Sequence, residues 1–214
     1  GFDSIVEAED SDADTLDFSL FTAVGGINLD LAASNQVVNE GDLTLEISDA
    51  AGIENVIGTA QWDQITGNSR DNVLTGGAGS DTYYFALDAL SLSPGVAETL
   101  GHDTIVEAAD VDDYDALDFA AFAPTSGGIT LDLSLTTGQV VKAGAPNVLT
   151  LTLSSGSGIE YVQGTSRSDS ITGNARANRL SGSAGNETIE GGAGNDTLIG
   201  GPGDDRYVFD ANVA

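Results

Sequence analysis

The sequence contains no cysteine and no methionine, and only 6 of its 214 residues are lysine or arginine. Without cysteine, the chain forms no disulfide framework and no thiolate metal site. So few basic residues exclude binding to nucleic-acid phosphates or to anionic lipid surfaces, because both need clustered cations. No apolar run reaches the length of a membrane span, and no signal-peptide pattern opens the chain. These absences argue against disulfide-rich, nucleic-acid-binding and membrane-inserted classes.

Acid dominates what is present, with 34 Asp and Glu residues and a formal net charge of −28. Such a charge destabilises a compact state through self-repulsion. The chain is nevertheless unlike a disordered acidic tail, because 40% of its residues are hydrophobic and β-branched residues are frequent. The composition therefore predicts strands that pack once the acid is neutralised, and a divalent cation is the simplest neutralising partner.

A long repeat of roughly a hundred residues divides the chain in two. The segment 3–7 (DSIVE) returns as 103–107 (DTIVE), and 25–31 (GGINLDL) returns as 127–133 (GGITLDL). The repeat predicts a first module at residues 1–85 and a second module at residues 103–214. Residues 86–102 are expected to form a connecting loop.

A short repeat of nine residues fills the later part of each module. Each nonapeptide carries a large apolar residue, an acid or amide two positions before it, and usually a glycine seven positions before it. The apolar positions are Val56, Ile65, Leu74 and Tyr83, followed in the second module by Val162, Ile171, Leu180, Ile189, Leu198 and Tyr207. Chance would not keep three residue classes in phase over so many repeats.

Each nonapeptide is expected to contain a glycine-rich loop followed by a short strand. One such strand cannot fold alone, but stacked coils bury their apolar residues against one another. With two nonapeptides in each turn, residues eighteen apart lie over one another. The prediction is an all-β, right-handed parallel β-roll or β-helix in two tandem modules. Tyr83 and Phe85 in the first module, and Tyr207 and Phe209 in the second, are expected to plug the end of each module's core.

The motif G-G-x-G-x-D appears in full at residues 76–81, 191–196 and 200–205. This pattern resembles the RTX (hemolysin-type) calcium-binding repeats of large secreted bacterial proteins. The resemblance implies several bound Ca²⁺ ions, each enclosed by two stacked loops that supply carboxylates and backbone carbonyls. The expected pairs are Asp63 with Asp81, Asp169 with Glu187, Glu187 with Asp205, and Asn178 with Asp196.

Carried over onto this chain, the resemblance implies ligands from loop backbones and from the acid or amide positions. These are Gly58, Ala60, Asp63, Gly77, Gly79, Asp81, Gly164, Ser166, Asp169, Gly173, Ala175, Asn178, Gly182, Ala184, Glu187, Gly192, Gly194, Asp196, Gly201, Gly203 and Asp205. Some positions depart from the pattern. Asn72 and Asn178 offer a neutral amide, which favours a structural role in the turn, and Glu187 is one methylene longer than aspartate. Stronger sites are expected in the second module.

The expected function is that of a non-enzymatic calcium-binding module in which ion binding and folding are one equilibrium. The resemblance implies type I secretion, an extracellular or cell-surface location, and membership of a larger polypeptide. Alternatives are an adhesive or surface-array stalk with cell-surface or polysaccharide contacts, or a module attached to a polysaccharide-modifying or lipolytic enzyme. His102, the single histidine, has no partner motif that would indicate catalysis.

Overall fold

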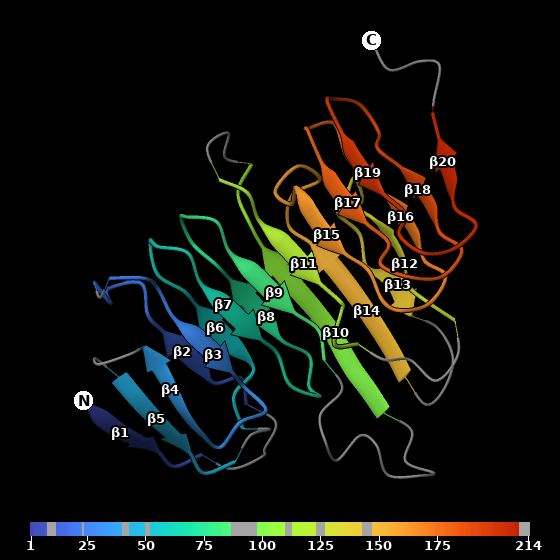
Figure 1. Cartoon of the computed structure of the whole chain (residues 1–214). Helices are drawn as coiled ribbons and strands as arrows, with labels where there is room; N and C mark the ends of the chain where they lie inside the picture. Colours follow the sequence, from blue (N-terminus) through green and yellow to red (C-terminus); the bar gives the residue numbers. More distant parts are fainter. Residues whose placement is uncertain are drawn as a thin grey trace.

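The computed structural model describes residues 1–7, 12–22, 24–39, 43–49, 52–86, 98–109, 113–122, 127–142 and 147–209. All regular secondary structure in these ranges is β-strand, and the strands form four sheets that together build a single stack (Figure 1). None of the described residues belongs to a helix that could cross a membrane. The all-β, parallel β-roll predicted from the repeats is confirmed.

A seven-stranded sheet runs along most of the stack, and two sheets share the opposite side (Figure 1). The seven-stranded sheet contains, in spatial order, β19 (Thr197–Ile199), β17 (Arg179–Ser181), β15 (Tyr161–Gln163), β11 (Ala116–Asp118), β9 (Thr82–Tyr84), β7 (Gln64–Thr66) and β3 (Asn28–Asp30). Opposite it lie a six-stranded sheet of β13 (Gln139–Lys142), β14 (Asn147–Leu153), β10 (Glu98–Val106), β8 (Val73–Thr75), β6 (Asn55–Ile57) and β2 (Thr15–Asp17), and a four-stranded sheet of β12 (Thr130–Asp132), β16 (Ser170–Thr172), β18 (Thr188–Glu190) and β20 (Arg206–Val208). The fourth sheet, at the N-terminal end, joins β1 (Phe2–Ile5), β5 (Leu43–Ile47) and β4 (Asn35–Asn39).

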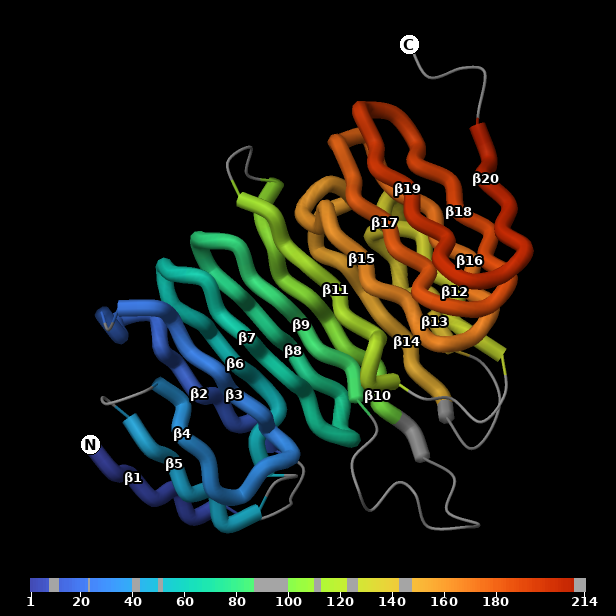
Figure 2. The backbone as a smooth tube through the Cα atoms, viewed as in Figure 1, coloured from blue at the N-terminus to red at the C-terminus, as the bar shows by residue number. Residues whose placement is uncertain are grey.

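The nonapeptide strands alternate between the two sides, so two of them complete one turn (Figure 2). Ile65 of β7 pairs with Tyr83 of β9, and Ile171 of β16 pairs with Ile189 of β18. Both pairs are eighteen residues apart, as the short repeat predicts. The central side chain of each of these four strands is fully buried in one continuous hydrophobic core, because alternate residues of a strand point to opposite faces.

The two modules form one uninterrupted stack. Strand β10 of the second module pairs with β8 of the first, and β11 pairs with β9. Equivalent strands change sides at this junction: β6 belongs to the six-stranded sheet, whereas its counterpart β15 belongs to the seven-stranded sheet. The second module is therefore stacked half a turn out of phase with the first. Residues 86–102 were predicted to form a connecting loop, but β10 begins at Glu98, so residues 98–102 belong to a strand. Residues 87–97 of this segment lie outside the described ranges.

Two hairpins interrupt the regular coil, and the sequence did not predict them. β4 and β13 run antiparallel to β5 and β14, at matching places in the two modules. Four aromatic residues were predicted to plug the end of each module's core, and the two modules differ in this respect. Tyr83 and Phe85 are 0% and 5% exposed because β11 covers them, and Phe85 stacks on Phe119. Tyr207 and Phe209 are 41% and 83% exposed, since no described strand lies beyond β19 and β20.

Candidate calcium sites

The acid and amide positions form columns along the edges of the stack, because each one directly precedes a strand. Before the seven-stranded sheet the column contains Asp63, Asp81, Asp115, Glu160, Asn178 and Asp196. It passes through both modules without a gap. A shorter column before the four-stranded sheet contains Asp169, Glu187 and Asp205.

Neighbouring members of a column are joined by hydrogen bonds from backbone to carboxylate. The Asp63 amide donates to Asp81 Oδ1 at 2.7 Å. The Asn178 amide donates to Asp196 Oδ1 at 2.9 Å, and the Glu187 amide donates to Asp205 Oδ1 at 3.2 Å. Three of the four expected pairs are thus brought into contact, and the members of the fourth, Asp169 and Glu187, directly precede the paired strands β16 and β18.

The loops that lead into these columns fall into two classes. In one class, here called glycine loops, the second and fourth residues have positive φ, which L-residues rarely adopt. Gly77 and Gly79 have φ of 115° and 107°, and Ser183 at 81° is the one described non-glycine residue with positive φ. The glycine loops are 76–81, 182–187, 191–196 and 200–205.

The glycines of these loops also allow the stacked loops to approach. A Cβ at Gly79 would lie 2.5 Å from the Gln61 carbonyl oxygen of the loop below, and one at Gly194 would lie 2.5 Å from that of Arg176. A Cβ at Gly203 would overlap the Gly185 carbonyl. Glycine is therefore required where the carbonyls of one coil approach the backbone of the next, and backbone carbonyl oxygens are among the ligands that Ca²⁺ accepts.

In the second class, here called locked loops, side-chain hydrogen bonds replace the glycines. Thr165 stands second in its loop, and its hydroxyl donates to Asp169 Oδ1 at 2.8 Å while its amide donates to Oδ2 at 2.8 Å. Thr59 makes the same hydroxyl bond to Asp63 Oδ1 at 2.9 Å. The carboxylates of Asp63 and Asp169 thus act as turn caps for loops 58–63 and 164–169.

The other two locked loops, 67–72 and 173–178, have asparagine at both the second and the sixth position. Asn178 Oδ1 accepts from the Asn174 amide at 2.8 Å, and Asn178 Nδ2 donates to Asn174 Oδ1 at 3.2 Å. Asn72 and Asn68 repeat both contacts at 2.8 and 3.1 Å. These bonds favour the structural role that the neutral amides suggested.

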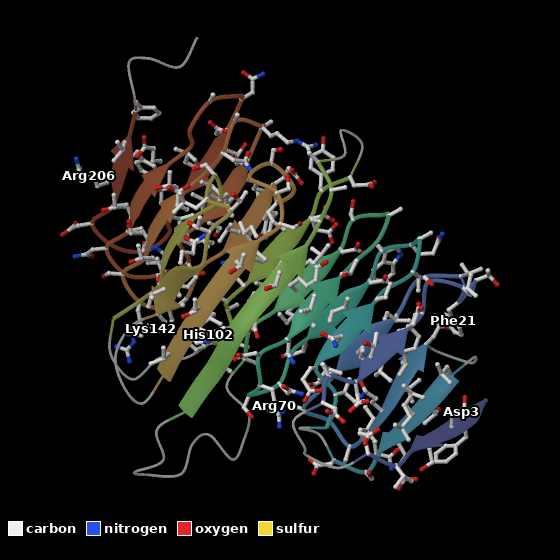
Figure 3. The ribbon with its side chains drawn as sticks, turned by 180° about the vertical axis from the view of Figure 1, so that it is seen from behind. Asp3, Phe21, Arg70, His102, Lys142 and Arg206 are labelled. Carbon is white, nitrogen blue, oxygen red and sulfur yellow. The ribbon has the colours of Figure 1, made fainter. Side chains whose placement is uncertain are left out.

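Arginine neutralises acid beside the asparagine loops. Arg176 Nη1 lies 2.9 Å from Glu160 Oε1, and Arg70 Nη2 lies 3.2 Å from Glu54 Oε1. Figure 3 labels Arg70 among the loops at the edge of the first module. Both arginines stand fourth in their loop, where the glycine loops have glycine. An internal cation therefore neutralises an acid of the adjacent coil at each of these two loops.

Two of the glycine loops, 76–81 and 182–187, leave buried carboxylate oxygens without a partner. Both Oε atoms of Glu187 and Oδ2 of Asp81 are buried and accept no hydrogen bond. Burial raises the pKa of Glu187 to about 7, with the Asp205 carboxyl adding to the shift. Burial also raises the pKa of Asp81 to about 9. A buried charge without a partner is strongly unfavourable, so these oxygens fit a hard, oxygen-seeking cation such as Ca²⁺.

The structure thus divides the residues predicted as ligands into unequal groups. Glu187 and Asp205 stand in two glycine loops stacked eighteen residues apart. The pairs of Asp81 with Asp63 and of Asp196 with Asn178 combine one glycine loop with one locked loop. Sequence reasoning did not select Glu107 and Asp115, whose carboxylates lie beside Asp81. The residue types at the second and fourth loop positions distinguish glycine loops from locked loops, and they could have been read from the sequence.

Comparison with known proteins agrees with this geometry. A family model described as RTX calcium-binding nonapeptide repeat (4 copies) matches residues 57–89, 154–186 and 181–211. A search of curated proteins finds no match. The matched segments contain all four glycine loops and all four locked loops. The nonapeptide part of this chain therefore consists of RTX calcium-binding repeats, which bind several Ca²⁺ ions.

Proposed function

We propose that this chain is a non-enzymatic structural segment of a larger extracellular protein, and that calcium binding completes its folding after type I secretion. The observation that carries the proposal is the set of buried carboxylate oxygens without a partner, at Glu187 and Asp81. In a chain of net charge −28, these groups oppose stacking until a cation occupies their loops. Calcium would then join coil to coil, so that its binding free energy becomes folding free energy.

The proposal is tested by titrating the full chain with Ca²⁺ and following far-UV circular dichroism and bound calcium together. We expect the β-sheet signal to be incomplete in excess chelator and to grow as calcium binds. Equal ionic strength supplied as KCl is the control, since it screens surface charge without filling a loop. A β-sheet signal that is already complete in chelator would refute the coupling between folding and calcium.

A second candidate function is a rigid stalk in an adhesive or surface array. The continuous stacking of the two modules favours it, because the strands on both sides of the junction share two sheets. A stalk of this kind would resist bending at the junction in calcium. Electron microscopy of the full chain would show straight particles of uniform length for a stalk, and a hinge at mid-length would count against it.

A further inference from the structure

The junction between the two modules contains a cluster of three carboxylates, two of which lie outside the nonapeptide loops. Asp81 belongs to glycine loop 76–81 of the first module, Glu107 follows β10, and Asp115 precedes β11. One carboxylate oxygen of each lies within 4.8 Å of the others. Their exposures of 0%, 7% and 3% show that all three are buried.

Two contacts fix the cluster in place. The Asp81 amide donates to Asp115 Oδ1 at 2.8 Å, which holds the two modules in register. The hydroxyl of Tyr83 donates to Glu107 Oε1 from within the core. A Cβ at Gly76 would overlap both Asp81 Oδ2 and Glu107 Oε1, so these two oxygens approach the same glycine. The carboxylates of both modules therefore converge on one small space beside Gly76.

The Asp63 amide favours the charged form of Asp81, but burial and the neighbouring acids outweigh it and raise the pKa of this carboxyl. Its Oδ2 atom accepts no hydrogen bond although the side chain is fully buried. The charged neighbours that raise the pKa of Asp81, after burial itself, are Glu107, Asp63 and Asp115, all of them acids. Burial likewise raises the pKa of Glu107 to about 8. Clustered buried carboxylates need either a cation or a shared proton.

We propose that Asp81, Glu107 and Asp115 bind one Ca²⁺ ion that joins the first module to the second. The donors are carboxylate oxygens only, which suits calcium and magnesium. The site is buried and irregular, and calcium tolerates such geometry better than magnesium, which demands an octahedron and keeps several waters. Asp81 comes from one module and the other two ligands from the next, so the binding site would form only when the modules stack.

The hundred-residue repeat supplies an internal control for this site. Glu7 and Asp14 occupy the positions of Glu107 and Asp115 in the first module. There β2 is the edge strand of its sheet, and Glu7 and Asp14 are only partly buried. At the other end Tyr207, the counterpart of Tyr83, accepts a hydrogen bond from the Gly200 amide at 2.8 Å and is 41% exposed. Only the junction brings both halves together in the described structure.

The test compares the full chain with a Glu107→Gln and Asp115→Asn double variant, and with a Glu7→Gln and Asp14→Asn control. Bound calcium is counted by native mass spectrometry and by isothermal titration. We expect the junction variant to bind one ion fewer than the wild type and the control to bind the same number. An unchanged count in the junction variant would refute the site and leave the proposed calcium-dependent folding standing, whereas a wild type that binds no calcium would refute both.

A second measurement keeps the test decisive if the double variant folds poorly. The phenol of Tyr83 touches Glu107, so Tb³⁺ at the junction should be sensitised by tyrosine excitation. We expect Tyr83→Phe to lower the sensitised emission while the number of bound Tb³⁺ ions is kept, and Tyr114→Phe, at an exposed position, to lower it less. Emission that does not depend on Tyr83 would contradict the proposal. A cluster that shares a proton instead would show an unchanged ion count in the double variant.

Discussion

At the scale of single residues, the position before each strand has two chemical roles in this protein. Where threonine or asparagine stands second in the loop, the acid or amide is satisfied by its own turn, as Asp169 is by Thr165. Where glycine or Ser183 stands there with positive φ, no side chain at that position caps the acid, and at Asp81 and Glu187 a buried carboxylate oxygen is left for a metal ion. The same residue type is thus a turn cap in one coil and a candidate ligand in another.

Glu187→Gln tests the ligand role. Removing this buried charge should weaken calcium binding and, in chelator, stabilise the protein, because an unneutralised buried carboxylate is unfavourable. Calcium titration and denaturant unfolding measure the two effects. Glu190→Gln, three residues along on β18, is the matched control and should change neither. A calcium-loaded Glu187→Gln protein with wild-type affinity would contradict the assignment.

Thr165→Val tests the locking role. The substitution removes the hydroxyl that donates to Asp169 Oδ1, and we expect the free energy of unfolding to fall by about 1 kcal/mol. The loss should be the same in calcium and in chelator, since the bond belongs to the protein alone. Thr172→Val on the neighbouring strand β16 is the control. A loss seen only with calcium would indicate that this loop is a metal site instead.

At the scale of elements, the two loop classes are distributed unevenly along the stack. Three successive glycine loops, 182–187, 191–196 and 200–205, precede β18, β19 and β20. The loops before β7 and β8 are both locked, and an ion pair between Arg70 and Glu54 supports them. The C-terminal coils therefore depend on the metal more than the coils of the first module do.

Hydrogen exchange should reveal this gradient. When calcium is withdrawn stepwise, we expect the amides of β18, β19 and β20 to lose protection before those of β7 and β8, because local stability follows the contacts that hold each segment. Mass-spectrometric exchange of the full chain at several free calcium concentrations measures it. Simultaneous loss of protection along the whole stack would contradict an uneven distribution of sites.

Much of this arrangement could be predicted from the sequence. The nine-residue period placed the central residues of the nonapeptide strands, and eighteen-residue stacking followed from two strands per turn. The half-turn offset between the modules could not be predicted, because it depends on how β10 and β11 pair across the junction. Glu107 was overlooked for the same reason, since its role appears only when Asp81 of the other module lies beside it.

At the scale of the whole molecule, burial of acid makes stability depend on pH. Burial raises the pKa of Asp103 to about 8, and the neighbouring Asp71 adds to the shift. The folded state therefore holds this proton at pH values where the unfolded chain has released it. The contribution of Asp103 to stability is complete below the ordinary pKa of 3.8 and is lost as the pH rises through about 8.

We accordingly expect the calcium-free protein to be more stable at pH 5 than at pH 8.5. Asp103→Asn should flatten this dependence, because an amide does not titrate. Asp3→Asn, at the exposed equivalent position in the first module, should leave the dependence unchanged. Denaturant unfolding in chelator at several pH values measures the effect, and stability that increases from pH 5 to pH 8.5 would be the opposite of this expectation.

The central claim is that calcium neutralises the acid columns and thereby makes the stack compact. Small-angle X-ray scattering of the full chain, in chelator and then in saturating Ca²⁺, tests it most directly. An unfolded chain of this length has a radius of gyration of about 50 Å, and a folded one is less than half of that. We predict a large decrease in the radius of gyration on adding calcium, mainly through ordering of the C-terminal coils. The same compact radius in chelator and in calcium would contradict the account.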